Sequence, residues 1–137
     1  MQLTKNFSLE EFTYSPTANA HKINNACGVE HTANIKALCE NVLQPLRDHL
    51  GVPIIITSGY RCTALNKLIG GAANSQHTKG QAVDFIVPSK DLRAVFNYIV
   101  ENLDFDQLLF EHNKQGDIWI HLSYVKNRKY YNANYFT

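Results

Sequence analysis

The sequence predicts an α+β fold in which helices pack on a small, mainly antiparallel sheet. A helical pattern over residues 32–49 precedes most of the strand-like segments. The last two of these, 105–111 and 118–125, are separated only by a polar hairpin that contains Gly116. Strands joined in this way pair antiparallel, and helices segregated from them are typical of the α+β class. With 137 residues, 45% of them hydrophobic, we expect a single domain over 1–137.

Residues 1–30 are expected to form an irregular arm that wraps around this domain. Residues 7–25 mix Ser, Thr, Asn, Pro and His with few apolar anchors. Within the arm, Ser8 can cap a short helical turn, and Glu11 three residues later completes a capping box.

A longer helix is predicted from a cap at Thr32 to about His49. Its apolar residues recur at helical spacing: Ile35, Leu38, Cys39, Val42, Leu46 and Leu50. Because Pro45 lacks the amide hydrogen that the helix needs, we expect a bend or interruption there. Gly51 is expected to end the helix.

The rest of the chain alternates between strands and helices. The β-branched run 52–57 predicts a buried strand, and a helix over 61–69 and a polar loop over 72–80 follow. Residues 82–87 predict a second strand. A helix capped by Ser89 should extend through Asn102, with an inner face of Leu92, Val95, Phe96 and Ile99. We expect the Asn- and Tyr-rich C-terminal stretch to be a frayed flap.

Charge and composition exclude several classes of function. Thirteen Lys and Arg against twelve Asp and Glu leave a net charge of +1, which argues against bulk binding to nucleic acid or anionic lipid. No apolar run is long enough to cross a bilayer, so no membrane insertion is expected. The N-terminal residues lack the apolar stretch of a signal peptide, which predicts synthesis in the cytoplasm.

Cysteine usage gives no sign of a covalent framework. The three cysteines, Cys27, Cys39 and Cys62, include no CxxC pair. Neither a disulfide framework nor a four-thiolate zinc site is therefore indicated, and we expect idle thiols in a reducing compartment.

Two strands carry polar residues where apolar ones are expected. Asp84 lies within the strand 82–87, and a carboxylate among apolar neighbours needs a partner or a metal. His77 lies in the loop before this strand. In the later strand His121 occupies the face opposite the apolar residues. Two His and one Asp could form a three-ligand zinc site that leaves a fourth position for water, as catalytic zinc sites do.

A hydrolytic zinc site also needs a base. Glu111 ends the strand before His121, and Asp117 begins the next strand. Alternation along each strand places Asp117 on the face of Trp119 and His121, and Glu111 on the face of Leu109. This alternation slightly favours Asp117, although Asp117 also fits a role in the turn, and it leaves the choice open.

The order and spacing of these polar residues resemble a known family over nearly all of the chain. The matching segments are Ser58-Gly59-Tyr60-Arg61, Asn66, Gly70-Gly71, Ser75-Gln76-His77, Gly80, Ala82-Val83-Asp84 and Trp119-Ile120-His121. They resemble the zinc D-alanyl-D-alanine carboxypeptidase family, whose relatives include phage peptidoglycan endopeptidases and, more distantly, the hedgehog signalling domain.

The resemblance implies a role for each matching residue. His77, Asp84 and His121 match the three zinc ligands. Arg61 matches the Arg that grips a substrate carboxylate or backbone carbonyl, although an Arg at this position could also open a helix at the surface. Ser75 matches a serine that contacts the substrate.

The base is where the sequence departs from the family pattern. Many members carry an acid or a His two or three residues before the last zinc ligand, where this chain has Trp119 and Ile118. The stretch 105–111, however, resembles the hedgehog segment that ends in a Glu beside the zinc water. We therefore expect Glu111, rather than Asp117, to be the base, assuming that an irregular hairpin changes the register.

The implied function is zinc-dependent hydrolysis of peptide bonds in peptidoglycan stem peptides. Either a D-Ala-D-Ala carboxypeptidase or an endolysin-type endopeptidase fits the site. Without a signal peptide, the protein would act on the wall once released, as a phage lysin does. The missing acid near the last ligand supports an alternative, a non-catalytic zinc-stabilised module that binds wall peptides or serves in a phage particle. We expect a monomer whose partners are peptidoglycan peptides, not nucleic acid.

Overall fold

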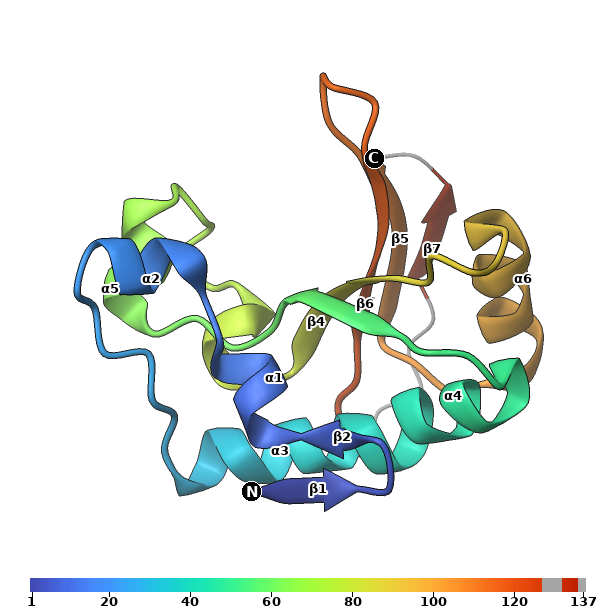
Figure 1. Cartoon of the computed structure of the whole chain (residues 1–137), viewed down its shortest axis with the longest axis horizontal. Coiled ribbons are helices and arrows are strands. Elements are labelled where there is room, and N and C mark those ends of the chain that lie inside the picture. The colour runs from blue at the N-terminus through green and yellow to red at the C-terminus, as the bar shows by residue number, and fades with distance from the viewer. Residues whose placement is uncertain (127–131, 136–137) are drawn as a thin grey trace.

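The predicted α+β class is confirmed. A computed structural model describes residues 1–126 and 132–135 (Figure 1). A five-stranded sheet has the order β3-β4-β6-β5-β7, and a separate pair is formed by β1 and β2. All the pairings are antiparallel except that of β5 with β7. The strands are β1 (Gln2–Thr4), β2 (Phe7–Ser8), β3 (Ile55–Ser58), β4 (Ala82–Ile86), β5 (Gln107–His112), β6 (Ile118–Ser123) and β7 (Asn132–Tyr135).

The helices pack mainly below and beside this sheet (Figure 1). They are α1 (Leu9–Thr13), α2 (Pro16–Ala20), α3 (Val29–Leu38), α4 (Gln44–Leu50), α5 (Thr63–Leu68) and α6 (Leu92–Asn102), with a π-helical segment η1 (Cys39–Leu43) and a 3-10 turn η2 (Gln76–Lys79). Among the described residues, none of the helices has both the length and the apolar character that crossing a bilayer requires.

The long helix is interrupted before Pro45, as predicted. The π-helical η1 separates α3 from α4, and the Gln44 amide donates to the Cys39 carbonyl five residues earlier. Gly51 ends α4 with a φ of 69°. The predicted start at Thr32 is wrong, because α3 begins directly after Gly28. The Thr32 hydroxyl instead donates to the Gly28 carbonyl at 2.9 Å, from within the helix.

The start of the helix α6 also differs from the prediction, and it lies later in the chain. Its N-cap is Asp91, whose carboxylate accepts from the Arg93 amide at 3.0 Å, rather than Ser89. Asp is as good a cap as Ser, so the preference for Ser at a helix N-terminus did not distinguish Ser89 from Asp91. The predicted inner face is confirmed, since all four of its residues are buried: Leu92, Val95, Phe96 and Ile99.

The N-terminal residues, expected to form an irregular arm, contain two strands and two short helices. The Ser8 amide donates to Glu11 Oε2 at 2.7 Å, so the expected capping box is present. The segment is attached to the helical layer, because the Thr4 hydroxyl donates to Gln44 Oε1 at 2.7 Å. Residues 23–28 have no regular structure.

The strand predicted over residues 52–57, which corresponds to β3, was expected to be buried. This prediction is wrong. β3 lies at the edge of the sheet, and Ile55 is 45% exposed. Its β-branched run resembles a strand covered on both faces, but residues 55 and 57 both reach solvent. At the opposite edge lies β7, which falls in the expected C-terminal flap. The rest of that stretch, 127–131 and 136–137, lies outside the described residues.

The two faces of the central strands differ. Val83 and Phe85 of β4 are fully buried, as are Ile120 and Leu122 of β6, and all four belong to one core with the helices. The residues that alternate with them point to the other face of the sheet. That face is therefore free to carry polar side chains.

Cys39 should be the least reactive of the three thiols, all of which are free. Burial, together with the charges of Glu11 and Glu40, raises its pKa to about 12. We therefore expect Cys39 to resist alkylation at pH 8 in the folded protein, whereas the partly exposed Cys62 reacts. Mass spectrometry of labelled peptides before and after unfolding measures this; equal labelling of both thiols in native buffer would contradict it.

The same shift makes stability depend on pH. Unfolding returns the Cys39 thiol to a pKa near its ordinary value of 9.0. Loss of the proton therefore favours the unfolded chain. The contribution of Cys39 to stability should be intact below about pH 9 and should fall as the pH rises towards 12.

Candidate metal centre

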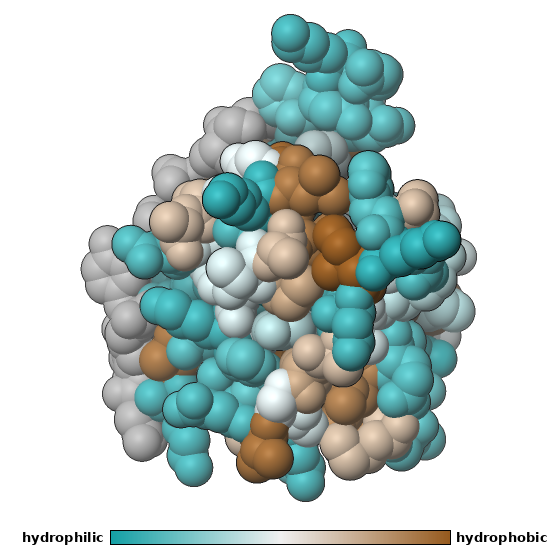
Figure 2. Space-filling view, turned by 90° about the vertical axis from the view of Figure 1, so that its left-hand side faces the viewer, coloured by the Kyte–Doolittle hydropathy of each residue, from teal (hydrophilic) through white to brown (hydrophobic). Residues whose placement is uncertain are grey.

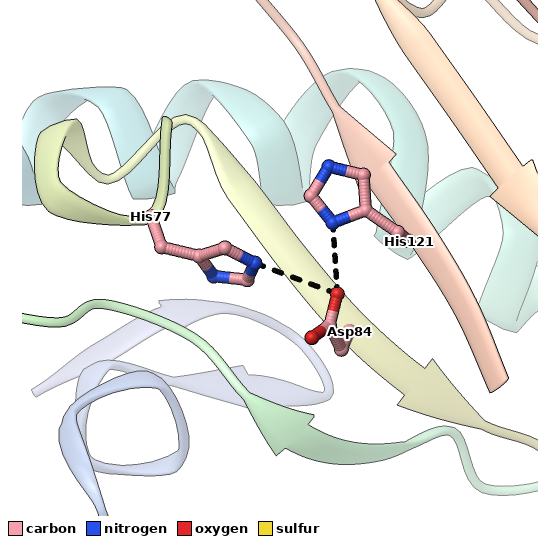
Figure 3. A group of neighbouring side chains, drawn as sticks. All are labelled: His77, Asp84 and His121. Atoms are coloured by element: carbon pink, nitrogen blue, oxygen red, sulfur yellow. Dashed lines mark hydrogen bonds and ion pairs between the residues drawn. The ribbon is translucent and has the colours of Figure 1, made fainter. Parts of the chain in front are cut away.

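Three side chains from separate elements converge on the open face of the sheet. His77 lies in η2, Asp84 in β4 and His121 in β6. One potential ligand atom of each lies within 4.8 Å of the other two (Figure 3). Asp84 Oδ1 is 2.8 Å from His121 Nδ1 and 3.5 Å from His77 Nε2. The structure thus brings together the three residues that the sequence singled out.

The pairing of β4 with β6 places two of these residues. Asp84 lies directly opposite His121, and Phe85 lies opposite Ile120. Residues paired across an antiparallel ladder point to the same face, so the carboxylate and the imidazole become neighbours. The apolar partners of the next rung turn into the core.

His77 is held in one orientation. Its ring is buried, and Nδ1 lies 2.8 Å from the Gly59 carbonyl oxygen. Because a carbonyl only accepts, Nδ1 carries the proton and Nε2 presents a lone pair towards Asp84. A histidine that binds a metal typically donates its other ring N–H in this way.

The Asp84 carboxylate is ionised in this setting. Burial acts to raise its pKa, but the hydrogen bond from His121 and the nearby His77 ring outweigh burial and bring the pKa well below its usual range. Two imidazoles and one carboxylate form a donor set that suits Zn²⁺ and leaves a coordination position open. The cluster therefore fits a zinc ion.

Arg61 and Ser75 lie beside the cluster. Arg61 follows β3, and its Nη2 donates to Ser75 Oγ at 3.3 Å. Its Nε is buried and has no hydrogen-bond partner among the described residues. Burial lowers the pKa of this guanidinium, while the charges of Asp84 and Glu111 act to raise it. Arg61 is therefore a half-buried cation close to both carboxylates, rather than a plain surface residue.

The two candidate bases occupy different surroundings. β5 and β6 pair without a register shift, so Glu111 lies opposite Trp119 and shares its face of the sheet with His121. The Trp119 indole donates to Glu111 Oε1 at 2.9 Å. Asp117 lies in the hairpin, where it accepts from the Asn113 side-chain amide at 3.0 Å.

The alternation argument therefore does not favour Asp117 over Glu111. Alternation within a strand does not reveal which residue of the next strand lies opposite. The regular pairing brings Glu111 to the face of His121, and the register change assumed for the hairpin is not needed.

Several residues that support the site were not found from the sequence. Gln76 Nε2 donates to the buried Asp106 carboxylate at 2.9 Å, directly before His77 in the chain. Asn25 and Gly59 hold the segment that leads to Arg61, as described below. Gln76 and Gly59 lie within segments that match the family, but the match assigns no role to either of them. These residues act through contacts between distant parts of the chain, which no local pattern encodes.

Substitution of Gly59 should destabilise the segment that supports His77. A Cβ atom there would lie 2.5 Å from the Phe12 carbonyl oxygen, and that backbone is itself fixed by a 2.7 Å hydrogen bond from the Tyr60 amide. We expect Gly59→Ala to cost about 1–3 kcal/mol, the usual range for overpacking. Urea unfolding measures this loss.

The matched control is Gly28→Ala, where the added Cβ meets nothing closer than 3.8 Å. This substitution should lower the free energy of unfolding by less than Gly59→Ala does, mainly because Ala is a weaker helix N-cap than Gly. Equal stabilities for wild type and Gly59→Ala would contradict the close packing of Gly59 on Phe12.

The comparison with protein families agrees with this geometry. A model described as Peptidase M15 matches residues 5–123, which include every candidate site residue discussed above. No curated protein matches the sequence. The match covers most of the chain and confirms the resemblance drawn from its motifs. The chain therefore belongs to the peptidase M15 family, the zinc D-Ala-D-Ala carboxypeptidase-like metallopeptidases.

Proposed function

We propose that this protein, acting as a single domain, hydrolyses peptide bonds in the stem peptides of peptidoglycan with the help of zinc. The observation that carries the proposal is the convergence of His77, Asp84 and His121 on an open sheet face, with Arg61 and Glu111 nearby. Membership of the peptidase M15 family supports the same chemistry.

His77 Nε2, Asp84 Oδ1 and His121 Nδ1 would hold the metal. When bound, zinc would polarise the scissile carbonyl and lower the pKa of the attacking water. The hydrogen bond from His77 to Gly59 keeps one ligand atom deprotonated, so this site is preorganised for a cation.

Glu111 would serve as the general base. The Trp119 indole occupies Oε1, which leaves Oε2 to take a proton from water and pass it to the leaving amine. Trp119 therefore acts as a positioning residue, although it stands where many family members have an acid or a His.

Arg61 and Ser75 would orient the substrate. A guanidinium can bind a carboxylate or a carbonyl oxygen through its fixed fork of N–H groups. The hydrogen bond from Arg61 Nη2 to Ser75 Oγ keeps this fork beside the turn that carries His77.

Digestion of purified peptidoglycan and of defined muropeptides tests the proposal. We expect zinc-loaded protein to release new fragments, and mass spectrometry of the products identifies the bond. Loss of a terminal alanine indicates a carboxypeptidase, and an internal cut indicates an endopeptidase of the endolysin type. Zinc-loaded protein that binds wall peptides without cutting them would contradict hydrolysis and favour a binding or phage structural module.

A further inference from the structure

A small cavity lies next to the candidate metal centre, and none of the three proposed metal ligands lines it. It has a volume of about 140 Å³. One wall is formed by residues 14–17, from the N-terminal part of the chain, and the other by residues 57–61. Leu65 of α5 and Ile69, directly after this helix, also line the cavity. Figure 2 faces the side on which α2 and α5 lie, where apolar side chains form small groups among hydrophilic ones.

The inner wall of the cavity is the segment that supports the metal ligands. Ser58 lies opposite Asp84 in the β3–β4 pairing. The next residue, Gly59, accepts the hydrogen bond of His77. Arg61 ends this wall and is the only charged side chain among the residues that line the cavity. A group that entered the cavity would therefore lie close to the proposed reaction centre.

The outer wall is connected to the inner one by hydrogen bonds of the buried Asn25 side chain. The Asn25 side-chain amide donates to the carbonyls of Thr13 and Tyr60, both at 2.9 Å, and its oxygen accepts from the Cys62 amide at 2.8 Å. Asn25 is only 8% exposed, so these bonds are protected from water. The two walls thus keep a fixed separation, as a size-selective site requires.

The dimensions and lining of the cavity indicate what it can hold. A cavity of about 150 Å³ takes a group the size of benzene, roughly six heavy atoms. An alanine residue, whose side chain is a single methyl group, has about that size. A residue with a long side chain does not fit. The lining combines the hydroxyls of Thr17, Thr57 and Ser58 with apolar atoms of Leu65 and Ile69, which suits a small residue of mixed polarity.

We propose that this cavity is a specificity subsite, which receives one short-side-chain residue of the wall peptide next to the scissile bond. Residues 14–17 set the size limit, and Asn25 is the positioning residue that keeps this wall in place. The inference rests on the proposed hydrolysis of wall peptides and adds the element that selects among them.

Thr17 offers a direct test because it is exposed, lines the cavity and is not one of the proposed metal ligands. Wild type should prefer a defined stem pentapeptide over analogues in which one alanine is lengthened by a methylene, by about tenfold or more at one position. Thr17→Phe should lower kcat/KM for the natural peptide by roughly 10–200-fold, and Thr17→Ala should reduce the discrimination against the longer analogue.

Asn19→Phe is the matched control, because Asn19 is also exposed on α2 but does not line the cavity. It should keep the wild-type kcat/KM and peptide preference. Zinc content and circular dichroism should be the same in all of these proteins. Unchanged kcat/KM and selectivity in both Thr17 variants would overturn the inference.

Peptide binding separates this inference from the proposed hydrolysis. If wild type cuts none of the peptides, hydrolysis fails, and calorimetry on the zinc-loaded protein then decides about the cavity. Weaker binding of the pentapeptide to Thr17→Phe, by tenfold or more, with no loss in Asn19→Phe, supports the subsite. Equal binding to both variants, or no binding to wild type, contradicts it.

Discussion

Glu111→Gln should leave zinc bound while lowering kcat on wall peptides by roughly 10²–10⁴, the range for one general base. Gln can still accept the hydrogen bond that the Trp119 indole donates to Glu111 Oε1, so the local structure should be preserved. What is lost is a carboxylate that can take the proton from water. Steady-state kinetics on a defined muropeptide, with zinc content measured on the same sample, checks the prediction.

Asp117→Asn is the matched control, because it tests the other candidate base with the same chemical change. Asp117 is exposed and bonded within its own hairpin, so its replacement should leave kcat within a few-fold of wild type. If Asp117→Asn loses the activity and Glu111→Gln keeps it, the assignment of the base is wrong.

Removal of any one proposed metal ligand should abolish both zinc binding and turnover. We expect His77→Ala, Asp84→Asn and His121→Ala to lower kcat/KM by roughly 10³-fold or more, because two remaining ligands do not hold a catalytic zinc at working concentrations. Asp84→Asn is the sharpest of the three, since it keeps the size of the side chain and removes only its charge. Elemental analysis should show about one zinc per chain in wild type and almost none in the variants.

His21→Ala is the control for general loss of a histidine, because His21 is exposed and distant in sequence from the cluster. It should bind zinc and turn over peptide as wild type does. A strong chelator should inactivate wild type, and added Zn²⁺ should restore it. Full zinc occupancy in Asp84→Asn together with normal turnover would contradict the proposed ligand set.

The parts of the fold that were predicted correctly depend on local signals. The inner face of α6 follows from apolar residues at helical spacing, and the β5–β6 hairpin follows from two apolar strands around a short polar turn. Pro45 marked the interruption of the long helix because a missing amide hydrogen acts within one turn. The starts of α3 and α6 were misplaced because several residues nearby could serve as caps.

The candidate site was predictable in part for the same reason. Asp84 and His121 stand out because alternation along a strand makes a polar residue in an apolar segment visible. The register between β5 and β6 is not local, so the face on which Glu111 lies required the structure. The same holds for Asn25, whose partner Tyr60 is 35 residues away.

Anomalous X-ray scattering at the zinc edge, recorded on crystals of zinc-loaded protein, tests the central claim most directly. We predict one strong peak within about 2.0–2.2 Å of His77 Nε2, Asp84 Oδ1 and His121 Nδ1, the usual range of zinc bonds to nitrogen and oxygen. The fourth position should hold water. A zinc peak elsewhere, or none between these three side chains, would contradict the account of this protein as a zinc peptidase.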